Sequence, residues 1–547
     1  MSTAEASASV KKEDQEISGN PKGGELLFCG ATMWEAAGRK NVDFSSTNLV
    51  SPVRLTSLMG INITFVAAGC ASNHCVALDV EGRCYTWGRN DKGQLGHGDL
   101  VQRDKPTLVS GLSNLKIVKA GGGKHHTVVV AADESSFTFG WNKHGQLGTG
   151  STKNEVESSP VRCLVTQVTN AVCGADFTLW LSTVPGSTIL TAGLPQYGQL
   201  GHGTDNEYNA KESAVKLAYE AQPRPRAIAS LSAKTITKVA CGSNHTVAVD
   251  SDGFVYTWGY GGYGRLGHRE QKDEWTPRLV EMFQRSNVLP PTAVVAAGSA
   301  HSACTAGGGQ LYMWGRVKQT GDNWMYPKPV FDLSGWNIRC IDFGYTHNIC
   351  GADDSCIGWG VSQNGELGFG PLGPKSSANP KKIDILDGMH VLSVACGFSH
   401  SLIVVDRTIL ADRIEKLEIF DGERPSQDDI EVEEEVPAKN TPVSKSGKKR
   451  KGASDDVPVE ASVKSEKKPR KKASKKKYSS NSDNSDDDGG DDDDTFSEED
   501  ANGSSKSHSK SRGRGRGRGA SRGASTGRGK SSRGRGKGKG AKSGKAR

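Results

Sequence analysis

The sequence predicts an all-β protein, a seven-bladed β-propeller, on the evidence of two recurring segments and of the way the two chain ends complete them. The first segment is a short apolar run that ends in an aromatic residue and glycine, followed by a Gly-x-Leu-Gly turn. It occurs at Trp87–Gly96, Phe139–Gly148, Trp258–Gly267 and Trp359–Gly368, and at Ala192–Gly201 without the aromatic residue. Repeats of this length are single supersecondary units that bury a core only by packing on their neighbours.

The second segment precedes the first and has the form small-Gly-x-x-His, followed by apolar residues. Its seven copies are Gly69–His74 (one residue longer), Gly121–His125, Cys173–Phe177, Cys241–His245, Ala297–His301, Phe343–His347 and Cys396–His400. In the copy at 241–245 an apolar run follows, then Ser251–Gly253, then a second apolar run. Two such runs around an Asp-Gly pair predict a β-hairpin, so each unit is a small antiparallel sheet.

The two ends of the repeat region carry complementary half-units. The last Gly-x-x-His copy runs into Ser401–Val405 and has no Trp-Gly strand after it, whereas Glu25–Gly30 is such a strand with no Gly-x-x-His copy before it. Pairing the two halves closes a ring and removes the exposed sheet edges. We therefore expect residues 24–412 to form a propeller whose last blade joins both ends. An insertion near 206–234 and a shortened turn after Gly315 interrupt the pattern.

The repeat histidines and the cysteines favour structure over chemistry. One histidine per blade is spread around a ring, whereas metal ligands must converge, so we expect each to donate a hydrogen bond within its own blade. The 12 cysteines include no Cys-x-x-Cys pair, which argues against a zinc site and a disulfide framework. Gly121–Lys124 lacks the spacing of a phosphate-binding loop. No catalytic constellation is recognisable, so the sequence predicts a protein that is not an enzyme and has no cofactor or metal.

Charge separates a nearly neutral body from a basic tail. Residues 413–547 hold 34 of the 70 Lys and Arg residues and 25 of the 62 Asp and Glu residues, in alternating acidic and basic blocks. Such blocks cannot bury enough apolar surface to offset ordering entropy, so we expect 413–547, like the polar residues 1–23, to be disordered. No apolar run approaches the roughly 20 residues of a membrane span, and the N-terminus lacks a signal peptide's apolar core. An intracellular protein without a membrane partner is predicted.

Three kinds of motif in the tail predict partners. Two basic clusters suit a nuclear import receptor, with an ordinary solvated charge run as the alternative: Lys448, Lys449, Arg450, Lys451, Lys467, Lys468, Arg470, Lys471 and Lys472. Arg-Gly repeats predict sequence-independent contact with nucleic acid through Arg512, Arg514, Arg516, Arg518, Arg522, Arg528, Arg533 and Arg535. Ser485 and Ser497 precede acidic residues as acidophilic kinase sites do. Phosphate there would add negative charge beside the basic end.

The paired Gly-x-x-His and Trp-Gly-x-x-x-x-Gly-Gln-Leu-Gly segments resemble the regulator of chromosome condensation repeat family over the whole of 24–412. Phe28–Lys40, Gly261–Glu274 and Met325–Lys328 resemble its second-regulator (telophase disc protein-like) branch. The resemblance implies a small GTPase of the Ran, Rac or Arf type as partner, and guanine-nucleotide exchange as a possible activity. It also implies a nuclear location on chromatin or in the nucleolus, with the cytoplasm and the mitotic apparatus as further sites.

For the contact surface, one loop combines aromatic and charged residues. Its candidates are Tyr260, Tyr263, Arg265, Arg269, Glu270, Lys272, Asp273, Glu274 and Trp275. Loops on a rigid scaffold commonly carry binding. No segment matches the family's exchange wedge, so the sequence leaves GTPase binding and exchange as separate possibilities.

Two alternatives to a GTPase partner remain. One is an RNA- or chromatin-binding scaffold that uses the tail for DNA, RNA or histone and has no GTPase link. The other is a propeller similar to the plant UV-B photoreceptors, which carry Gly-Trp-Arg-His-Thr segments. At the equivalent positions this chain has Gly-Ser-Asn-His-Thr246 and Gly-Phe-Ser-His-Ser401, and the absence of tryptophan there argues against light reception.

Overall fold

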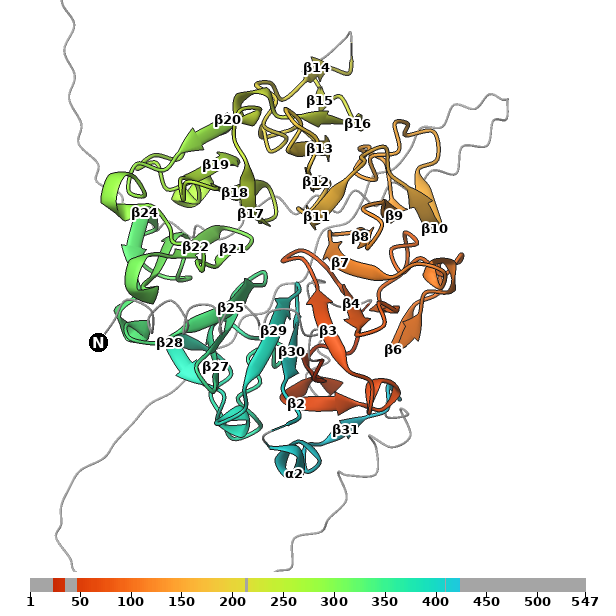
Figure 1. Ribbon diagram of the computed structural model, residues 1–547, viewed down its shortest axis with the longest axis vertical. Coiled ribbons are helices and arrows are strands. Elements are labelled where there is room, and N and C mark those ends of the chain that lie inside the picture. The colour runs from red at the N-terminus through yellow and green to blue at the C-terminus, as the bar shows by residue number, and fades with distance from the viewer. Residues whose placement is uncertain (1–22, 35–46, 212–214, 409, 424–547) are drawn as a thin grey trace, which may run out of the picture. The chain divides into compact units, whose positions relative to one another are not determined.

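Six four-stranded antiparallel sheets and one five-stranded sheet stand around a central axis (Figure 1). This computed structural model describes residues 23–34, 47–211, 215–408 and 410–423. The predicted seven-bladed propeller, with a last blade shared by the two ends of the repeat region, is confirmed.

Six blades are built from consecutive segments, each with its first strand nearest the axis in Figure 1. Blade 1 comprises β3 (Ile63–Ala67), β4 (His74–Asp79), β5 (Cys84–Gly88) and β6 (Arg103–Leu108); blade 2 comprises β7 (Ile117–Gly122), β8 (His126–Ala131), β9 (Ser136–Trp141) and β10 (Val156–Arg162); blade 3 comprises β11 (Val168–Cys173), β12 (Phe177–Ser182), β13 (Ile189–Gly193) and β16 (Gln222–Ala227). Blade 4 comprises β17 (Ile236–Cys241), β18 (His245–Asp250), β19 (Val255–Gly259) and β20 (Glu274–Leu279); blade 5 comprises β21 (Val295–Ala297), β22 (His301–Thr305), β23 (Leu311–Gly315) and β24 (Trp324–Pro329); blade 6 comprises β25 (Ile338–Phe343), β26 (His347–Ala352), β27 (Ser355–Gly360) and β28 (Ser377–Lys382).

Blade 7 is the closing blade. Its strands, in spatial order, are β29 (Val391–Cys396), β30 (His400–Val405), β1 (Glu25–Gly30), β2 (Leu49–Leu55) and β31 (Ile419–Phe420). The helix α2 (Ala411–Ile414) spans the expected boundary at residue 412 and β31 lies beyond it, and Ile414 and Leu417 are buried in an apolar cluster of blades 6 and 7. The folded body therefore extends past the expected boundary, because these apolar side chains cover the outer part of the last blade.

Short connections complete the chain. These are the 3₁₀ turns η3 (Thr56–Leu58), η4 (Ser110–Leu112), η5 (Ala229–Leu231), η6 (Gly262–Gly264), η7 (Arg285–Asn287), η8 (Gly307–Gly309), η9 (Phe331–Leu333) and η10 (Asp384–Leu386). The hairpin of β14 (Glu207–Asn209) and β15 (Leu217–Tyr219) is a separate two-stranded sheet. Of the expected insertion at 206–234, only the hairpin part is extra, since β16 is the regular fourth strand of blade 3.

The second strand of each blade is covered on both sides. Every residue of β4, β8, β12, β18, β22, β26 and β30 is buried. Because a blade packs one face on the preceding blade and the other on the next, both sets of alternating side chains are in the core. This explains why the sequence shows nearly continuous apolar runs there rather than apolar-polar alternation.

Aromatic residues at the ends of third strands fill the space between blades. Trp87, Trp258, Trp314 and Trp359 are at most 2% exposed. The Leu-Gly turn of the preceding blade packs on Trp258 and on Trp314: a Cβ atom on Gly267, whose φ is +80°, would lie 3.1 Å from the Trp314 ring. In blade 3 the register position is Ala192, and Trp180 of β12 takes over the filling role, 2.6 Å from a Cβ built on Gly148.

A proline occupies one register position in all seven fourth strands. These are Pro52, Pro106, Pro160, Pro225, Pro277, Pro327 and Pro380, each three residues after the residue that pairs with the last glycine of the third strand. Proline has no backbone N–H to offer a further strand, and it is tolerated at a sheet edge for that reason. The outer rim is thereby protected against edge-to-edge pairing.

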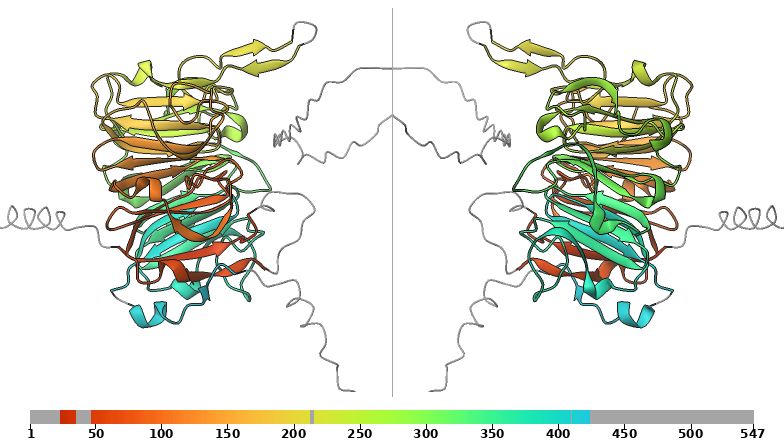
Figure 2. Two further views of the ribbon diagram at one scale, coloured as in Figure 1. Left: turned by 90° about the vertical axis from the view of Figure 1, so that its right-hand side faces the viewer. Right: turned by 90° about the vertical axis from the view of Figure 1, so that its left-hand side faces the viewer.

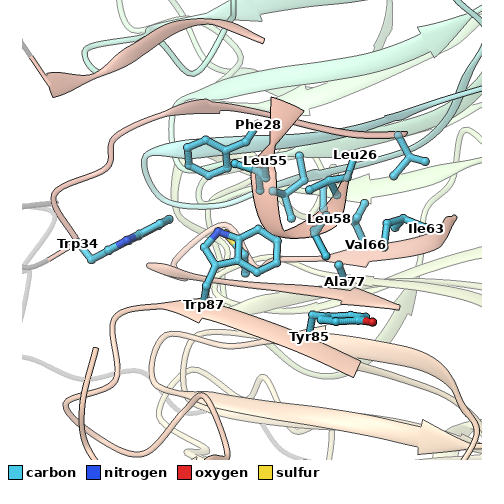
Figure 3. Packing of buried hydrophobic residues seen from close by; sticks show 14 residues of the cluster. Leu26, Phe28, Trp34, Leu55, Leu58, Ile63, Val66, Ala77, Tyr85 and Trp87 are labelled. Carbon is cyan, nitrogen blue, oxygen red and sulfur yellow. The ribbon is translucent and has the colours of Figure 1, made fainter. Parts of the chain in front are cut away.

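Charges join the two chain ends within blade 7, and backbone pairing joins blade 7 to blade 1. Glu25 is 3% exposed and accepts from Nε of Arg54 at 3.0 Å and from Nη2 of Arg407. Gly24 exchanges two backbone hydrogen bonds with Ile63 of β3, at 2.8 and 3.0 Å. Phe28, Trp34 and Trp87 share one apolar cluster across this seam (Figure 3).

The repeat histidines link neighbouring blades, which corrects the expectation of a hydrogen bond within each blade. Nε2 lies 2.6–2.9 Å from a side-chain oxygen on the second strand of the next blade, in the pairs His74–Thr127, His126–Thr178, His245–Ser302, His301–Asn348 and His347–Ser401. The acceptor is the residue directly after the repeat histidine, or its replacement Phe177, in the next blade. A pattern within one blade cannot reveal this relationship.

The glycine of the Gly-x-x-His segment is needed because the imidazole ring of the histidine packs directly over it. A Cβ on Gly123, Gly242, Gly344 or Gly397 would lie 2.1–2.2 Å from Cε1 of the histidine three residues later. The blade 2 copy is therefore Gly123–His126. The sequence reading of Gly121–His125 was wrong by register, because two adjacent histidines follow three adjacent glycines there. Burial lowers the pKa of His126 to about 3.

Candidate functional site

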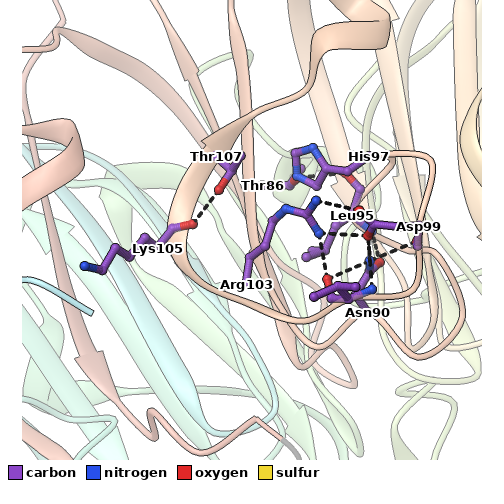
Figure 4. A network of polar contacts seen from close by, with 9 residues as sticks. Thr86, Asn90, Leu95, His97, Asp99, Arg103, Lys105 and Thr107 are labelled. Carbon is purple, nitrogen blue, oxygen red and sulfur yellow. Dashed lines mark hydrogen bonds and ion pairs between the residues drawn. The ribbon is translucent and has the colours of Figure 1, made fainter. Parts of the chain in front are cut away.

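One face of the propeller carries the loops between the third and fourth strands of every blade. In an antiparallel blade the turn between strands one and two and the loop between strands three and four emerge at the same end. We call this end the loop face. Within blade 1, Nδ2 of Asn90 donates to the carbonyls of Asp99 and Val101 at 3.1 and 3.0 Å, and Arg103 pairs with Asp99 at 2.8 Å (Figure 4). The loops are thus fixed in place by their own side chains, as a rigid binding scaffold requires.

The hairpin of β14 and β15 extends the loop face at blade 3. It is inserted between β13 and β16 and projects away from the sheets (Figure 2). Tyr208 is 51% exposed and Leu217 is 52% exposed. A two-stranded hairpin alone is marginally stable in water, so this element is suited to contact with a partner.

The seam between blades 3 and 4 brings aromatic residues together on this face. The rings of Tyr197 and Tyr260 lie against each other, with centroids 4.6 Å apart and planes tilted by 34°. Trp275 of β20 is 44% exposed and packs along Gly198, whose φ of +74° and missing Cβ make room for the indole. Gly203 donates its backbone N–H to the carbonyl of Trp275 at 2.8 Å. We refer to Tyr197, Tyr208, Leu217, Tyr260 and Trp275 as the aromatic surface.

Arg265 positions the tyrosines from below the surface. Its side chain is fully buried, and its guanidinium lies 4.4 Å from the ring centroid of Tyr260 and 5.6 Å from that of Tyr263. Nη1 donates to the carbonyl of Ser299 in blade 5 at 2.6 Å. Arg265 therefore supports the loop and is not itself available to a partner.

The loop folds around Arg265 through backbone contacts to its own second half. The backbone N–H of Gly261 donates to Asp273 at 2.8 Å, and that of Tyr263, at a φ of +59°, donates to Gln271 at 3.0 Å. Burial raises the pKa of Asp273. Lys272 is exposed at the outer side of the same loop.

The remaining predicted contact residues lie on the outer rim. Glu270 and Glu274 both accept from Nη1 of Arg278, at 2.5 and 2.7 Å, so their charges are neutralised. Arg269 is exposed and stacks on Tyr326 of blade 5 with 4.6 Å between guanidinium and ring centroid. The nine sequence-predicted residues are thus divided between the aromatic surface, its buried support and a cationic rim.

Sequence reasoning missed the half of the site that comes from blade 3. Tyr197 follows Ala192-Gly193 in the copy that lacks its aromatic residue, and Tyr208 and Leu217 lie in the insertion. Burial and then the carboxylates of Glu207, Asp205 and Asp273 raise the pKa of Tyr219, which places the base of the hairpin beside the blade 4 loop. The position of Tyr197 within its repeat could have revealed it. It directly precedes Gly-Gln-Leu-Gly, and this part of the turn lies next to the loop of the following blade.

The predicted tail sites lie outside the described residues. This holds for the import clusters at 448–451 and 467–472, the Arg-Gly repeats at 512–535, and Ser485 and Ser497. Among the residues that the structure does describe, no three His, Cys, Asp or Glu side chains are grouped so that they could hold a metal ion. None of the helices formed by that part of the chain has the length and apolar character of a membrane span.

Comparison with known proteins bears on the repeats directly. Models of the regulator of chromosome condensation (RCC1) repeat match residues 81–130, 133–181, 188–249, 252–305 and 353–404, and a second such model matches 63–94 and 236–265. Human protein RCC2 is 39% identical over 415 residues, which cover 72% of this chain and 78% of the human one. The chain belongs to the RCC1-repeat family. Residues 306–352, which neither model matches, nonetheless form regular strands of blades 5 and 6.

Two more distant relatives show how far the likeness extends. The ultraviolet-B receptor UVR8 of Arabidopsis thaliana is 29% identical over 374 residues, covering 67% of this chain and 78% of that receptor. The structure of Prp20p from Saccharomyces cerevisiae superposes with a TM-score of 0.55 at 18% identity, covering 72% of this chain and 94% of the yeast chain. At that identity the yeast structure shows the shared fold.

Proposed function

We propose that this RCC1-repeat protein binds a small GTPase through the aromatic surface of blades 3 and 4 and acts in the nucleus on chromatin. The observation that carries the proposal is the packing of the Tyr197 ring against that of Tyr260 beside the exposed Trp275. Tyrosine and tryptophan on a fixed scaffold are the residues that supply most of the energy of protein interfaces.

The hairpin gives this surface a possible second role. A projecting two-stranded element with Tyr208 and Leu217 exposed has the shape to enter a groove of the bound GTPase. Exchange requires only that an inserted element distort the nucleotide pocket, so it needs no catalytic side chains on the propeller. Binding and exchange are therefore separable, the first resting on the seam and the second on the hairpin.

The choice of a GTPase also draws on the relatives. The yeast Prp20p structure is described together with binding to Gsp1p and histones. In the proposal, the basic clusters of the tail bind a nuclear import receptor, and its Arg-Gly repeats contact DNA, RNA or histone. Phosphorylation of Ser485 and Ser497 would then weaken the contact of the basic end with nucleic acid.

Fluorescent-GDP release from Ran, Rac and Arf GTPases, measured with the full chain, tests the proposal. We expect one GTPase to release nucleotide faster, and we expect Tyr260→Ala with Trp275→Ala to abolish the effect. Trp141→Ala is the matched control. Trp141 directly follows the last paired glycine of the third strand in blade 2, and Tyr260 has the same position in blade 4. Binding without release would assign an adaptor role. No binding to any of the three would favour the chromatin or RNA scaffold.

A further inference from the structure

Five cations on the rim of blades 4 to 6 have no carboxylate partner. They are Arg269, Arg316, Lys318, Lys328 and Lys381. Among the described residues, no Asp or Glu oxygen lies within the 4.0 Å of an ion pair from any of them. The Arg316–Asn323 loop contains a single acid, Asp322. None of these five cations is thus held by an ion pair.

Aromatic rings hold these cations in place instead. Arg269 and Lys328 lie 4.6 and 5.4 Å from the centroid of Tyr326, and Lys328 lies 5.5 Å from that of Trp324. Arg316 lies 5.1 Å from Tyr263, and Lys381 lies 5.0 Å from Phe369. Nζ of Lys318 bonds to Asn379 of β28 at 3.2 Å, which joins the blade 5 loop to the next outer strand. We call these cations and rings the cationic strip.

Cations lie over rings elsewhere on the propeller too, as Lys92 and Lys143 do over Trp141, but in the strip they do so on the neighbouring blades 4, 5 and 6. Several arginines outside the strip instead meet carboxylates: Arg83 with Asp79, Arg103 with Asp99, and Arg278 with Glu270 and Glu274. A cation stacked on a ring keeps its full charge and most of its hydrogen-bond donors, while its side chain loses part of its freedom. The strip is therefore already ordered for an anionic ligand.

We propose that the cationic strip binds an acidic segment of a partner protein, laid across the outer strands β24 and β28. Arg, Trp and Tyr together are typical of protein interfaces. Here Trp324, Tyr326 and Lys328 alternate along β24, and Lys381 lies on β28, the outer strand of the next blade (Figure 1). The prolines Pro327, Pro329 and Pro380 in these strands preclude a fully paired added strand. The ligand is thus recognised by side-chain charge rather than by backbone pairing.

Single-stranded nucleic acid fits the same charges less well. Base stacking requires an open aromatic face, and Tyr326, the most exposed ring of the strip at 37%, already carries a guanidinium on one face and an ammonium within reach. A carboxylate-bearing chain needs no such face. This inference does not rest on GTPase binding, because the three lysines that test it, Lys318, Lys328 and Lys381, lie on blades 5 and 6 and outside the aromatic surface.

Photocrosslinking with the full chain tests the strip. The probe is a peptide of alternating Asp and Glu carrying one benzophenone, and crosslinked peptides are located by mass spectrometry. We expect crosslinks at β24 and β28, and we expect K318E/K328E/K381E to reduce them on the order of tenfold or more. The control K116E/K143E/K153E reverses three exposed lysines on blades 1 and 2, so it changes net charge equally, and it should leave these crosslinks unchanged.

Site-resolved crosslinking separates the strip from the basic tail, which also attracts acidic peptides. Crosslinks confined to residues 413–547, or an equal loss in both triple variants, would overturn the proposal. So would a benzophenone-tagged oligonucleotide of equal charge that labels β24 more strongly than the peptide, since nucleic acid would then be the ligand. Melting curves of the variants identify any loss that is due to unfolding.

Discussion

Nε2 of His74 lies 2.7 Å from Oγ1 of Thr127, across the seam between blades 1 and 2. Thr127 donates its only hydroxyl proton to the carbonyl of Gln94 at 2.8 Å, so the imidazole is the donor of the pair. The same relay recurs where Thr178 bonds to the carbonyl of Gln146 and where Ser302 bonds to that of Arg265. A chain of histidine, hydroxyl and carbonyl thus joins one blade to the next inside the core.

Removing the acceptor of this relay is expected to destabilise the propeller. Thr127→Val leaves a fully buried imidazole N–H without a partner, which costs about 1–3 kcal/mol. The double variant H74F/T127V removes both polar groups and should recover part of that loss, as Phe177 does naturally in blade 3. Urea unfolding monitored by tryptophan fluorescence measures the free energy of unfolding of both variants. A double variant less stable than the single one would contradict the relay.

Acid is expected to unfold the propeller through these histidines. Burial lowers the pKa of His74 and His301 to about 4 and that of His126 and His400 to about 3. The folded form keeps them neutral, whereas the unfolded chain takes up protons below the ordinary pKa of 6.5. The stability that the neutral histidines contribute is therefore complete above pH 6.5. It is lost as the pH falls towards 4, and the free energy of unfolding falls by up to about 1.4 kcal/mol per histidine and pH unit.

The free energy of unfolding at pH 7.5, 6 and 5 checks this dependence. Burial raises the pKa of Asp342 to about 7, which acts in the opposite direction, but it is one group against several histidines. H74F/T127V should show a shallower acid slope than the unchanged protein. Equal slopes would mean that other groups cause the acid sensitivity.

A missing acceptor at the closing seam offers a way to stabilise the ring. His400 is fully buried, and neither of its ring nitrogens has a hydrogen-bond partner among the described residues. The register position that Thr127 and Thr178 occupy in their blades is Cys75 in blade 1. Cys75→Ser should therefore raise stability by about 0.5–1.5 kcal/mol.

Cys350→Ser is the matched control for that substitution. Cys350 is also fully buried on a second strand and in an apolar cluster, but it lies three residues after His347 rather than at the acceptor position directly after the repeat histidine. A hydroxyl there has no acceptor and should destabilise the protein. Thermal melting of both variants gives the comparison, and a loss of stability in Cys75→Ser equal to that of the control would exclude a bond to His400.

Replacing the Glu25 carboxylate is expected to destabilise the closing blade. Glu25→Gln leaves Arg54 and Arg407 with an uncompensated charge in a site where the carboxylate is 3% exposed. The cost should be about 2–3 kcal/mol, below the usual value for a buried pair because Arg407 is partly exposed. Glu81→Gln, which breaks only a surface pair with Arg83, should have a much smaller effect. Urea unfolding distinguishes the two, and equal losses would refute a special role for Glu25 in closure.

The blade count, the closure and the aromatic core were predictable because they follow from sequence patterns within each repeat. Trp-Gly strands and Gly-x-x-His turns are local, and seven imperfect copies average out the irregular ones. The blade 2 register was not predictable from the pattern alone, since His125 and His126 both follow glycines. Only the fit of the His126 ring over Gly123 separates them.

The candidate site was half predictable. The loop at 260–275 was recognised by its composition, but composition could not tell that Arg265 is buried while Trp275 is exposed. It also could not place Tyr197 against Tyr260, because the two residues belong to different repeats. The cationic strip escaped notice for the same reason, since its five cations come from three blades.

The sequence by itself determined the repeat, the number of blades and the residues that each blade buries, because these follow from patterns within one unit. The tertiary structure alone decided which residues of different blades meet. Thr127 is 53 residues from His74, and Arg407 is more than 380 residues from Glu25. Such pairs form only when the ring closes and one blade's face packs on the next, so the hydrogen-bond relay, the closing charges and both proposed binding surfaces are properties of the assembled ring.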